Sequence, residues 1–109
     1  AKSDDFFFLI EVGGQPVGQC AIYDIDRGAG SAEIGRFLVA PEKAGHGYIT
    51  RSCEQLVRFG MTMLDLSYLF LEVMERNDKA ARIYKRCGFR EESRSEGLVR
   101  MGLKRGAAK

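Results

Sequence analysis

The chain has 109 residues, of which 45% are hydrophobic and 29% are charged, and its net charge is +2. This length fits one domain over residues 1–109. The basic residues are interleaved with acidic ones, which argues against a nucleic-acid binder. No apolar run approaches the roughly 20 residues of a membrane span, and no basic segment leads into a signal-type stretch, so we expect a cytoplasmic protein without a membrane partner.

The first half of the chain predicts an antiparallel meander. Residues 6–12 are rich in aromatic and β-branched side chains, as strands are. A glycine- and proline-containing turn leads to a second predicted strand over residues 17–25. Another glycine-rich turn leads to a third strand over residues 33–39.

The periodicity then changes. Apolar residues recur at helical spacing and predict an amphipathic helix over residues 47–64. The near-continuous apolar run at residues 68–73 is typical of a strand covered on both faces. A strand, a helix and another strand in this order predict a crossover between parallel strands.

The last part of the chain predicts a short helix and a hairpin. Asn77 or Asp78 is suited to cap a second helix that ends near residue 86, and Gly88 suits its C-terminal stop. Residues 89–94 and 97–103 predict a closing hairpin. Residues 106–109 are expected to be a frayed end.

The turn before the long helix can bind an anion. The first turn of a helix leaves N–H groups unpaired, and Gly45 and Gly47 would let a phosphate approach them closely. The two glycines alone also fit a tight loop without a ligand. A P-loop is disfavoured because Tyr48 and Ile49 follow the last glycine, and a dinucleotide fingerprint would need a glycine in place of Thr50.

A second motif lies near the predicted second helix. The spacing N-x-x-A-x-x-x-Y-x-x-x-G-F runs from Asn77 through Tyr84 to Phe89. Asn77 and Tyr84 are about two helical turns apart, so both can face one cleft. The alternatives are a helix cap for Asn77 and an ordinary core tyrosine for Tyr84.

Together, the glycine turn and this second motif resemble the acetyl-coenzyme A core of GNAT-type N-acetyltransferases. The resemblance covers about residues 6–104 and is nearest the branch that acts on polyamines, amino sugars, protein N-termini and ribosomal proteins. It implies an α/β fold with a mixed sheet in the order β-β-β-α-β-α-β-β. The first strand and helices that usually open this fold are not found in the chain.

The resemblance also implies the reaction and the cofactor site. An acetyl group would pass from acetyl-CoA to the primary amine of a small molecule or peptide, by direct attack in a ternary complex. Ala44 stands where the family pattern has Gln or Arg, and Ile49 where a small residue is usual. The implied cofactor-binding residues are Phe37, Leu38, Val39, Ala44, Gly45, His46, Gly47, Tyr48, Ile49, Asn77 and Ala80.

The same resemblance implies a phenol as general acid and a carboxylate as base. A tyrosine at the position of Tyr84 protonates the departing thiolate. The base, acting directly or through a water, would be Glu72 or Glu33, and Glu72 is favoured. Each could instead be a solvated charge at a strand end. The three cysteines fall on apolar faces and predict a buried core rather than disulfides, a metal site or a covalent nucleophile.

Two other classes of function stay open. The departures at Ala44 and Ile49 fit a catalytically impaired CoA-binding or protein-interaction module of GNAT type. A nucleotide-binding domain would bind ATP or NAD instead. The apolar strand at residues 6–10 offers an exposed edge through which a homodimer could form.

Overall fold

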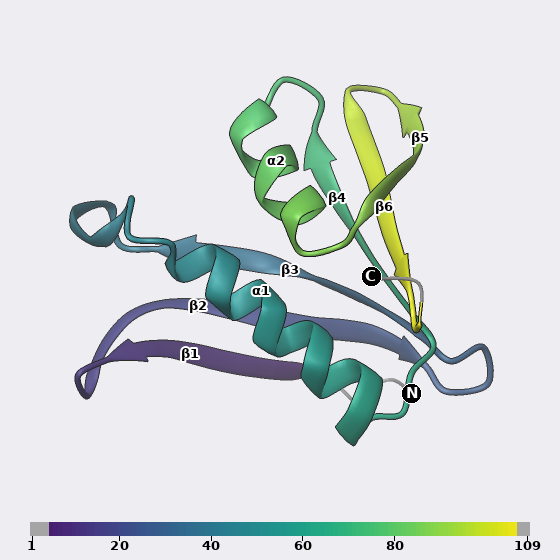
Figure 1. The fold of residues 1–109 in the computed structure, drawn as a ribbon, viewed down its shortest axis with the longest axis horizontal. Helices are drawn as coiled ribbons and strands as arrows, with labels where there is room; N and C mark the ends of the chain where they lie inside the picture. Colours follow the sequence, from purple (N-terminus) through teal and green to yellow (C-terminus); the bar gives the residue numbers. More distant parts are fainter. Residues whose placement is uncertain (1–4, 107–109) are drawn as a thin grey trace.

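The computed structural model describes residues 5–106, and the predicted frayed end falls largely outside them. The described residues form a six-stranded sheet in the order β1-β2-β3-β4-β6-β5, with two α-helices (Figure 1). The elements are β1 (Phe6–Val12), β2 (Gln15–Asp26), β3 (Ser31–Val39), η1 (Pro41–Lys43), α1 (Tyr48–Arg58), η2 (Phe59–Met63), β4 (Tyr68–Met74), α2 (Asp78–Arg86), β5 (Arg90–Ser95) and β6 (Leu98–Lys104).

The order of elements predicted from the sequence is confirmed, with two differences in detail. The second strand starts at Gln15 and includes Pro16, which lies at an irregularity in the β1–β2 pairing where a missing N–H is tolerated. The long helix is α-helical only to Arg58 and ends in a π-helical turn. In that turn Gly60 lies so close to Ile22 that an added Cβ would be 3.2 Å from its Cδ1.

The core lies between the helices and one face of the sheet. Along β4 the buried residues alternate, with Leu69, Leu71 and Val73 pointing to the core. The expectation that both faces of this strand are covered is wrong, because Glu72 and Met74 on the opposite face are exposed. The apolar run is nearly continuous because the second face carries aromatic side chains rather than polar ones.

The middle of the sheet splits. β3 and β4 are parallel, as the predicted crossover requires, but they pair only from Ser31–Tyr68 to Glu33–Phe70. Beyond Phe70, β4 stays with β6 as far as Met74 while β3 stays with β2 as far as Val39. Figure 1 shows the two strands fanning apart, with α2 beside β4.

A bulge in β3 changes which side chains face the helices. The register with β2 shifts between Gln19 and Ala21, and Arg36 has a positive φ of 54°. Before the bulge Ile34 points to the core, and after it Phe37 does so, where it meets the ring of Tyr84. The extra residue therefore turns Phe37 toward α2 at the place where the strands separate.

The outer edge of the sheet is apolar. β1 is an edge strand, and Phe7 and Leu9 on its outer face are 63% and 66% exposed. Within residues 5–106, the helices are too short or too polar to cross a membrane.

Candidate functional site

The glycine turn has the backbone geometry predicted for an anion site. Gly45 and Gly47 both have positive φ, at 86° and 77°, which side chains other than glycine rarely adopt. Gly47 is the N-cap of α1, and no side chain caps this helix end. The N–H groups of the first turn are therefore available to a ligand.

A pocket of about 130 Å³ opens beside this turn. Lys43 and Lys79 contribute to its wall, so cationic groups from two elements surround the glycines. A Cβ built on Gly45 would meet no atom within 4 Å, which shows that space lies in front of the backbone. The lining residues are Val39, Lys43, Ala44, Gly45, Gly47, Tyr48, Ile49, Thr50, Lys79 and Ile83. These residues fit a phosphate-bearing cofactor.

The two departures from the family pattern both lie in this pocket. Ala44 supplies no polar group there, and Ile49 contributes apolar surface. His46 is exposed and stacks on Tyr48, with the ring centroids 5.4 Å apart. Its carbonyl oxygen accepts a hydrogen bond from Arg51, so the loop is tied to α1 through its backbone.

The predicted pantetheine-binding stretch runs along the separated part of β3. Phe37 packs on Tyr84 with centroids 5.8 Å apart, and Leu38 is 62% exposed. Val39 lines the pocket beside the glycine turn. On the β4 side β3 has no pairing beyond Glu33 within the described residues, which leaves that backbone edge free for an extended ligand.

Asn77 and Ala80 are joined by a helix cap. The Asn77 side-chain oxygen accepts a 3.1 Å hydrogen bond from the backbone N–H of Ala80. The capping alternative is thus confirmed for Asn77. The cap occupies the backbone N–H of Ala80, whereas the side-chain N–H₂ group of Asn77 takes no part in it.

Tyr84 reaches the split from the helix side. Its side chain is 9% exposed and touches the rings of Phe37 and Phe89. Burial raises the pKa of Tyr84 well above its usual value near 10, so the phenol keeps its proton at neutral pH. Within residues 5–106 the hydroxyl forms no hydrogen bond, and because no fully buried polar side-chain atom there lacks a partner, the hydroxyl oxygen keeps some access to solvent.

Glu33 and Glu72 lie together on the opposite face of the sheet. Both side chains alternate with buried neighbours, and they come from β3 and β4 at the end of the paired segment. Burial raises the pKa of Glu33, and the charges of Glu72 and Asp24 raise it further. The carboxylates of Asp24 on β2, Glu33 on β3 and Glu72 on β4 are therefore close enough to interact electrostatically.

Sequence reasoning missed Asp24, Tyr23 and Arg36 as parts of this region. Tyr23 is directly opposite Glu33 in the β2–β3 register, and the Arg36 guanidinium lies 3.9 Å from the centre of its ring. The exact length of the turn between β2 and β3 would have fixed the strand register, and that register pairs Tyr23 with Glu33. Among the described residues no group of three histidine, cysteine or acidic side chains is close enough to hold a metal.

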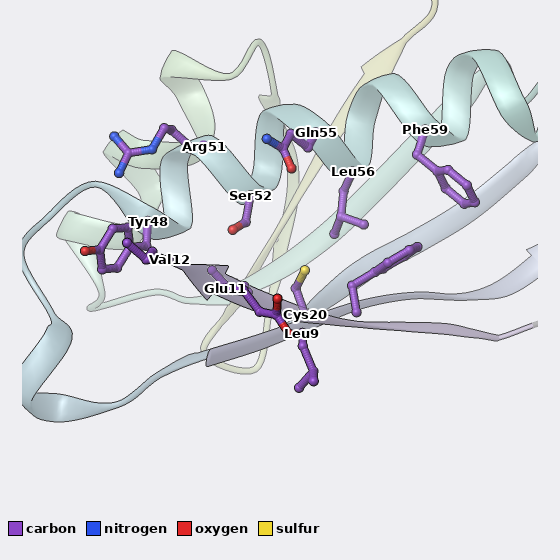
Figure 2. A pocket seen from close by; sticks show the side chains of 12 residues that line it. Leu9, Glu11, Val12, Cys20, Tyr48, Arg51, Ser52, Gln55, Leu56 and Phe59 are labelled. Carbon is purple, nitrogen blue, oxygen red and sulfur yellow. The ribbon is translucent and has the colours of Figure 1, made fainter. Parts of the chain in front are cut away.

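A larger pocket, of about 510 Å³, lies between α1 and the edge strand β1. Figure 2 shows Ser52 and Leu56 of α1 and Phe59 of η2 pointing toward this strand. Its lining includes one predicted cofactor residue, Tyr48, and none of the predicted catalytic residues. This pocket is therefore separate from the predicted catalytic residues.

Known proteins with similar sequences are acetyltransferases by name. Spermidine N(1)-acetyltransferase from Escherichia coli K12 is 33% identical over 82 residues, which cover 75% of this chain and 44% of that protein. The putative ribosomal N-acetyltransferase YdaF from Bacillus subtilis is 30% identical over 91 residues, covering 83% and 49%. The chain thus spans about half the length of these relatives.

The fold is also found in solved structures. A dodecameric spermidine N-acetyltransferase from Vibrio cholerae has a TM-score of 0.83 and 25% identity, covering 92% of this chain and 64% of that one. The sequence profile described as "Acetyltransferase (GNAT) family" matches residues 1–89. Because this match covers most of the chain, it shows that the chain belongs to the GNAT acetyltransferase family.

Proposed function

We propose that this chain carries the acetyl-CoA-binding and catalytic core of an N-acetyltransferase that acetylates a cationic primary amine. The observation that carries the proposal is the split between β3 and β4. It has the glycine turn and Tyr84 on the helix side and the carboxylates of Glu33 and Glu72 on the other. A thioester and an amine could therefore meet from opposite faces.

The acetyl donor would lie along the free edge of β3. The pyrophosphate would bind the first-turn N–H groups beside Gly47, with Lys43 and Lys79 contributing charge. The amides of the pantetheine arm would pair with the backbone of residues 37–39. This arrangement brings the thioester sulfur toward the hydroxyl of Tyr84.

The reaction needs one proton to leave the attacking amine and another to reach the departing sulfur. The bound ammonium gives one proton to Glu33 or Glu72, and the freed lone pair attacks the thioester carbonyl. As the tetrahedral adduct collapses, the C–S bond breaks and Tyr84 gives its proton to the sulfur. The nitrogen gives its second proton to the tyrosinate, which restores Tyr84, and the carboxyl group releases the first proton to water. The products are the acetylated amine, CoA thiol and one released proton.

The acceptor class follows from charge. Asp24, Glu33 and Glu72 favour a cation with more than one amino group, because separate carboxylates can bind separate ammonium groups. Polyamines have this chemistry, and the similar proteins from Escherichia coli and Vibrio cholerae are both named spermidine acetyltransferases. We therefore place spermidine first among acceptors.

Two measurements test the proposal. Calorimetric titration with acetyl-CoA should show binding, and thiol release with spermidine should exceed that with a monoamine such as butylamine. Tight acetyl-CoA binding with no thiol release across polyamines, amino sugars and peptides would instead support a CoA-binding module without turnover. Binding of ATP or NAD in place of acetyl-CoA would refute the cofactor assignment.

Assembly and location are separate proposals. The exposed edge of β1, with Phe7 and Leu9, is where self-association would occur. Sedimentation velocity of the wild type and of a Leu9→Lys variant tests this, since a monomeric wild type would contradict it. We also propose a cytoplasmic location, which fractionation of expressing cells would test.

A further inference from the structure

Tyr23 lies where it can act on Glu33. The two residues are partners in the antiparallel β2–β3 register, next to the point where β3 and β4 separate. Burial raises the pKa of Glu33, and the neighbouring Tyr23 phenol lowers it in opposition.

The ring of Tyr23 is held from two sides. A Cβ added to Gly35 would lie 2.7 Å from the Tyr23 hydroxyl oxygen, so the phenol occupies the space that this glycine leaves open. The Arg36 guanidinium covers the ring face at 3.9 Å from its centre. Arg36 has this position because the bulge gives it a positive φ of 54°.

The surrounding charges are on four strands. Asp24 on β2 and Glu72 on β4 raise the pKa of Glu33, while Arg100 on β6 lowers it, and Arg36 on β3 acts on Tyr23. Burial and the Glu33 charge raise the pKa of Tyr23 to about 12. Tyr23 is thus a protonated donor throughout the neutral range.

We infer that Tyr23 is a positioning residue that orients Glu33 as the base that accepts the amine proton, with Gly35 and Arg36 holding its phenol in place. The inference rests on the proposed acetyl transfer and selects Glu33 over Glu72, the carboxylate favoured by the sequence. The base and the acid then lie on either side of the same split.

The test compares Tyr23→Phe with Tyr68→Phe. Tyr68 is a suitable control because its hydroxyl donates to a different carboxylate, that of Glu92, on the same sheet. The pKa of Glu33 is measured by carbon-13 NMR of the carboxyl group, which needs no turnover. The acid limb of kcat/KM for spermidine and the KM for acetyl-CoA are measured in parallel.

The expected result is a rise of ~0.5–1 unit in the pKa of Glu33 in Tyr23→Phe, because a donor to the charged form is lost. The acid limb should move with it, kcat should fall about 10-fold, and the KM for acetyl-CoA should not change. Tyr68→Phe should match the wild type. Gly35→Ala should reproduce the pKa rise, because its methyl group displaces the phenol.

Two results would overturn the inference: an unchanged Glu33 pKa in both Tyr23→Phe and Gly35→Ala, or an acid limb that does not follow the pKa of Glu33. A different result would refute the proposed function instead. If the Glu33 pKa shifts as expected but the wild type acetylates no amine, the coupling between the two side chains stands and the acetyl transfer fails.

Discussion

Tyr84→Phe separates catalysis from packing. The ring is 9% exposed and packs on Phe37 and Phe89, and all of these contacts remain in phenylalanine. The lost hydroxyl forms no hydrogen bond within the described residues. The free energy of unfolding should therefore change by less than about 1 kcal/mol, which is the usual value of one such bond.

The effect on rate should be much larger. A positioned general acid contributes roughly 10²–10⁴-fold, so its loss should raise the barrier by about 3–5 kcal/mol. Because burial holds the pKa of Tyr84 above its usual range, the wild-type phenol is protonated at every assay pH below about 10. Loss of activity in the variant should thus be nearly independent of pH.

The assay is thiol release at saturating spermidine, with acetyl-CoA affinity measured by calorimetry and stability by urea unfolding. Tyr68→Phe removes a hydroxyl from the face of the sheet opposite Tyr84 and serves as the control. The reasoning fails if kcat drops less than about 3-fold, or if acetyl-CoA affinity falls as much as kcat does.

Three further predictions follow from the same geometry. Gly47→Val should weaken acetyl-CoA binding at least about 10-fold by calorimetry, because it blocks the approach of the phosphate and strains a positive φ. The control is Gly97→Val in the β5–β6 turn, which introduces a similar strain at a φ of 82° and should leave the affinity for acetyl-CoA unchanged. Iodoacetamide at pH 8 should label Cys87 first, because Cys87 is partly exposed and its interaction with Cys53 lowers its pKa. Cys20 and Cys53 are buried and have raised pKa values. Peptide mapping that finds Cys20 labelled first would contradict this prediction. The free energy of unfolding should fall as pH rises past 10, because the folded state binds the protons of Tyr23 and Tyr84 more tightly than the unfolded state does. Urea unfolding of Tyr84→Phe should show a shallower decline with pH than the wild type. An equally steep decline in the two proteins would be evidence against the raised pKa of Tyr84.

Elements and their order were readable from the sequence because they depend on local patterns. Alternating and aromatic runs predicted the meander, helical spacing predicted α1, and either Asn77 or Asp78 was predicted to cap α2, where the structure has Asn77. Gly45 and Gly47 adopt positive φ values that few other residues accept, which is consistent with the turn predicted there.

The arrangement of the carboxylates was not readable in this way. Asp24, Glu33 and Glu72 are scattered along the chain, and only strand pairing brings them into one field. The sequence favoured Glu72 by its place in a motif, whereas burial and the neighbouring Tyr23 distinguish Glu33. Such distinctions depend on the desolvation of a side chain and on its distance from other charges, which are properties of the packed state.

By itself, then, the sequence determined the family, the elements and the glycine turn, because each depends on the local conformational and hydrophobic preferences of short segments. The tertiary structure decided where β3 and β4 separate, which face Phe37 takes after the bulge at Arg36, and which carboxylate Tyr23 meets. The reason is that register and bulges follow from how whole strands pack against the helices. A shift of one residue in that register would turn each of these side chains to the other face of the sheet.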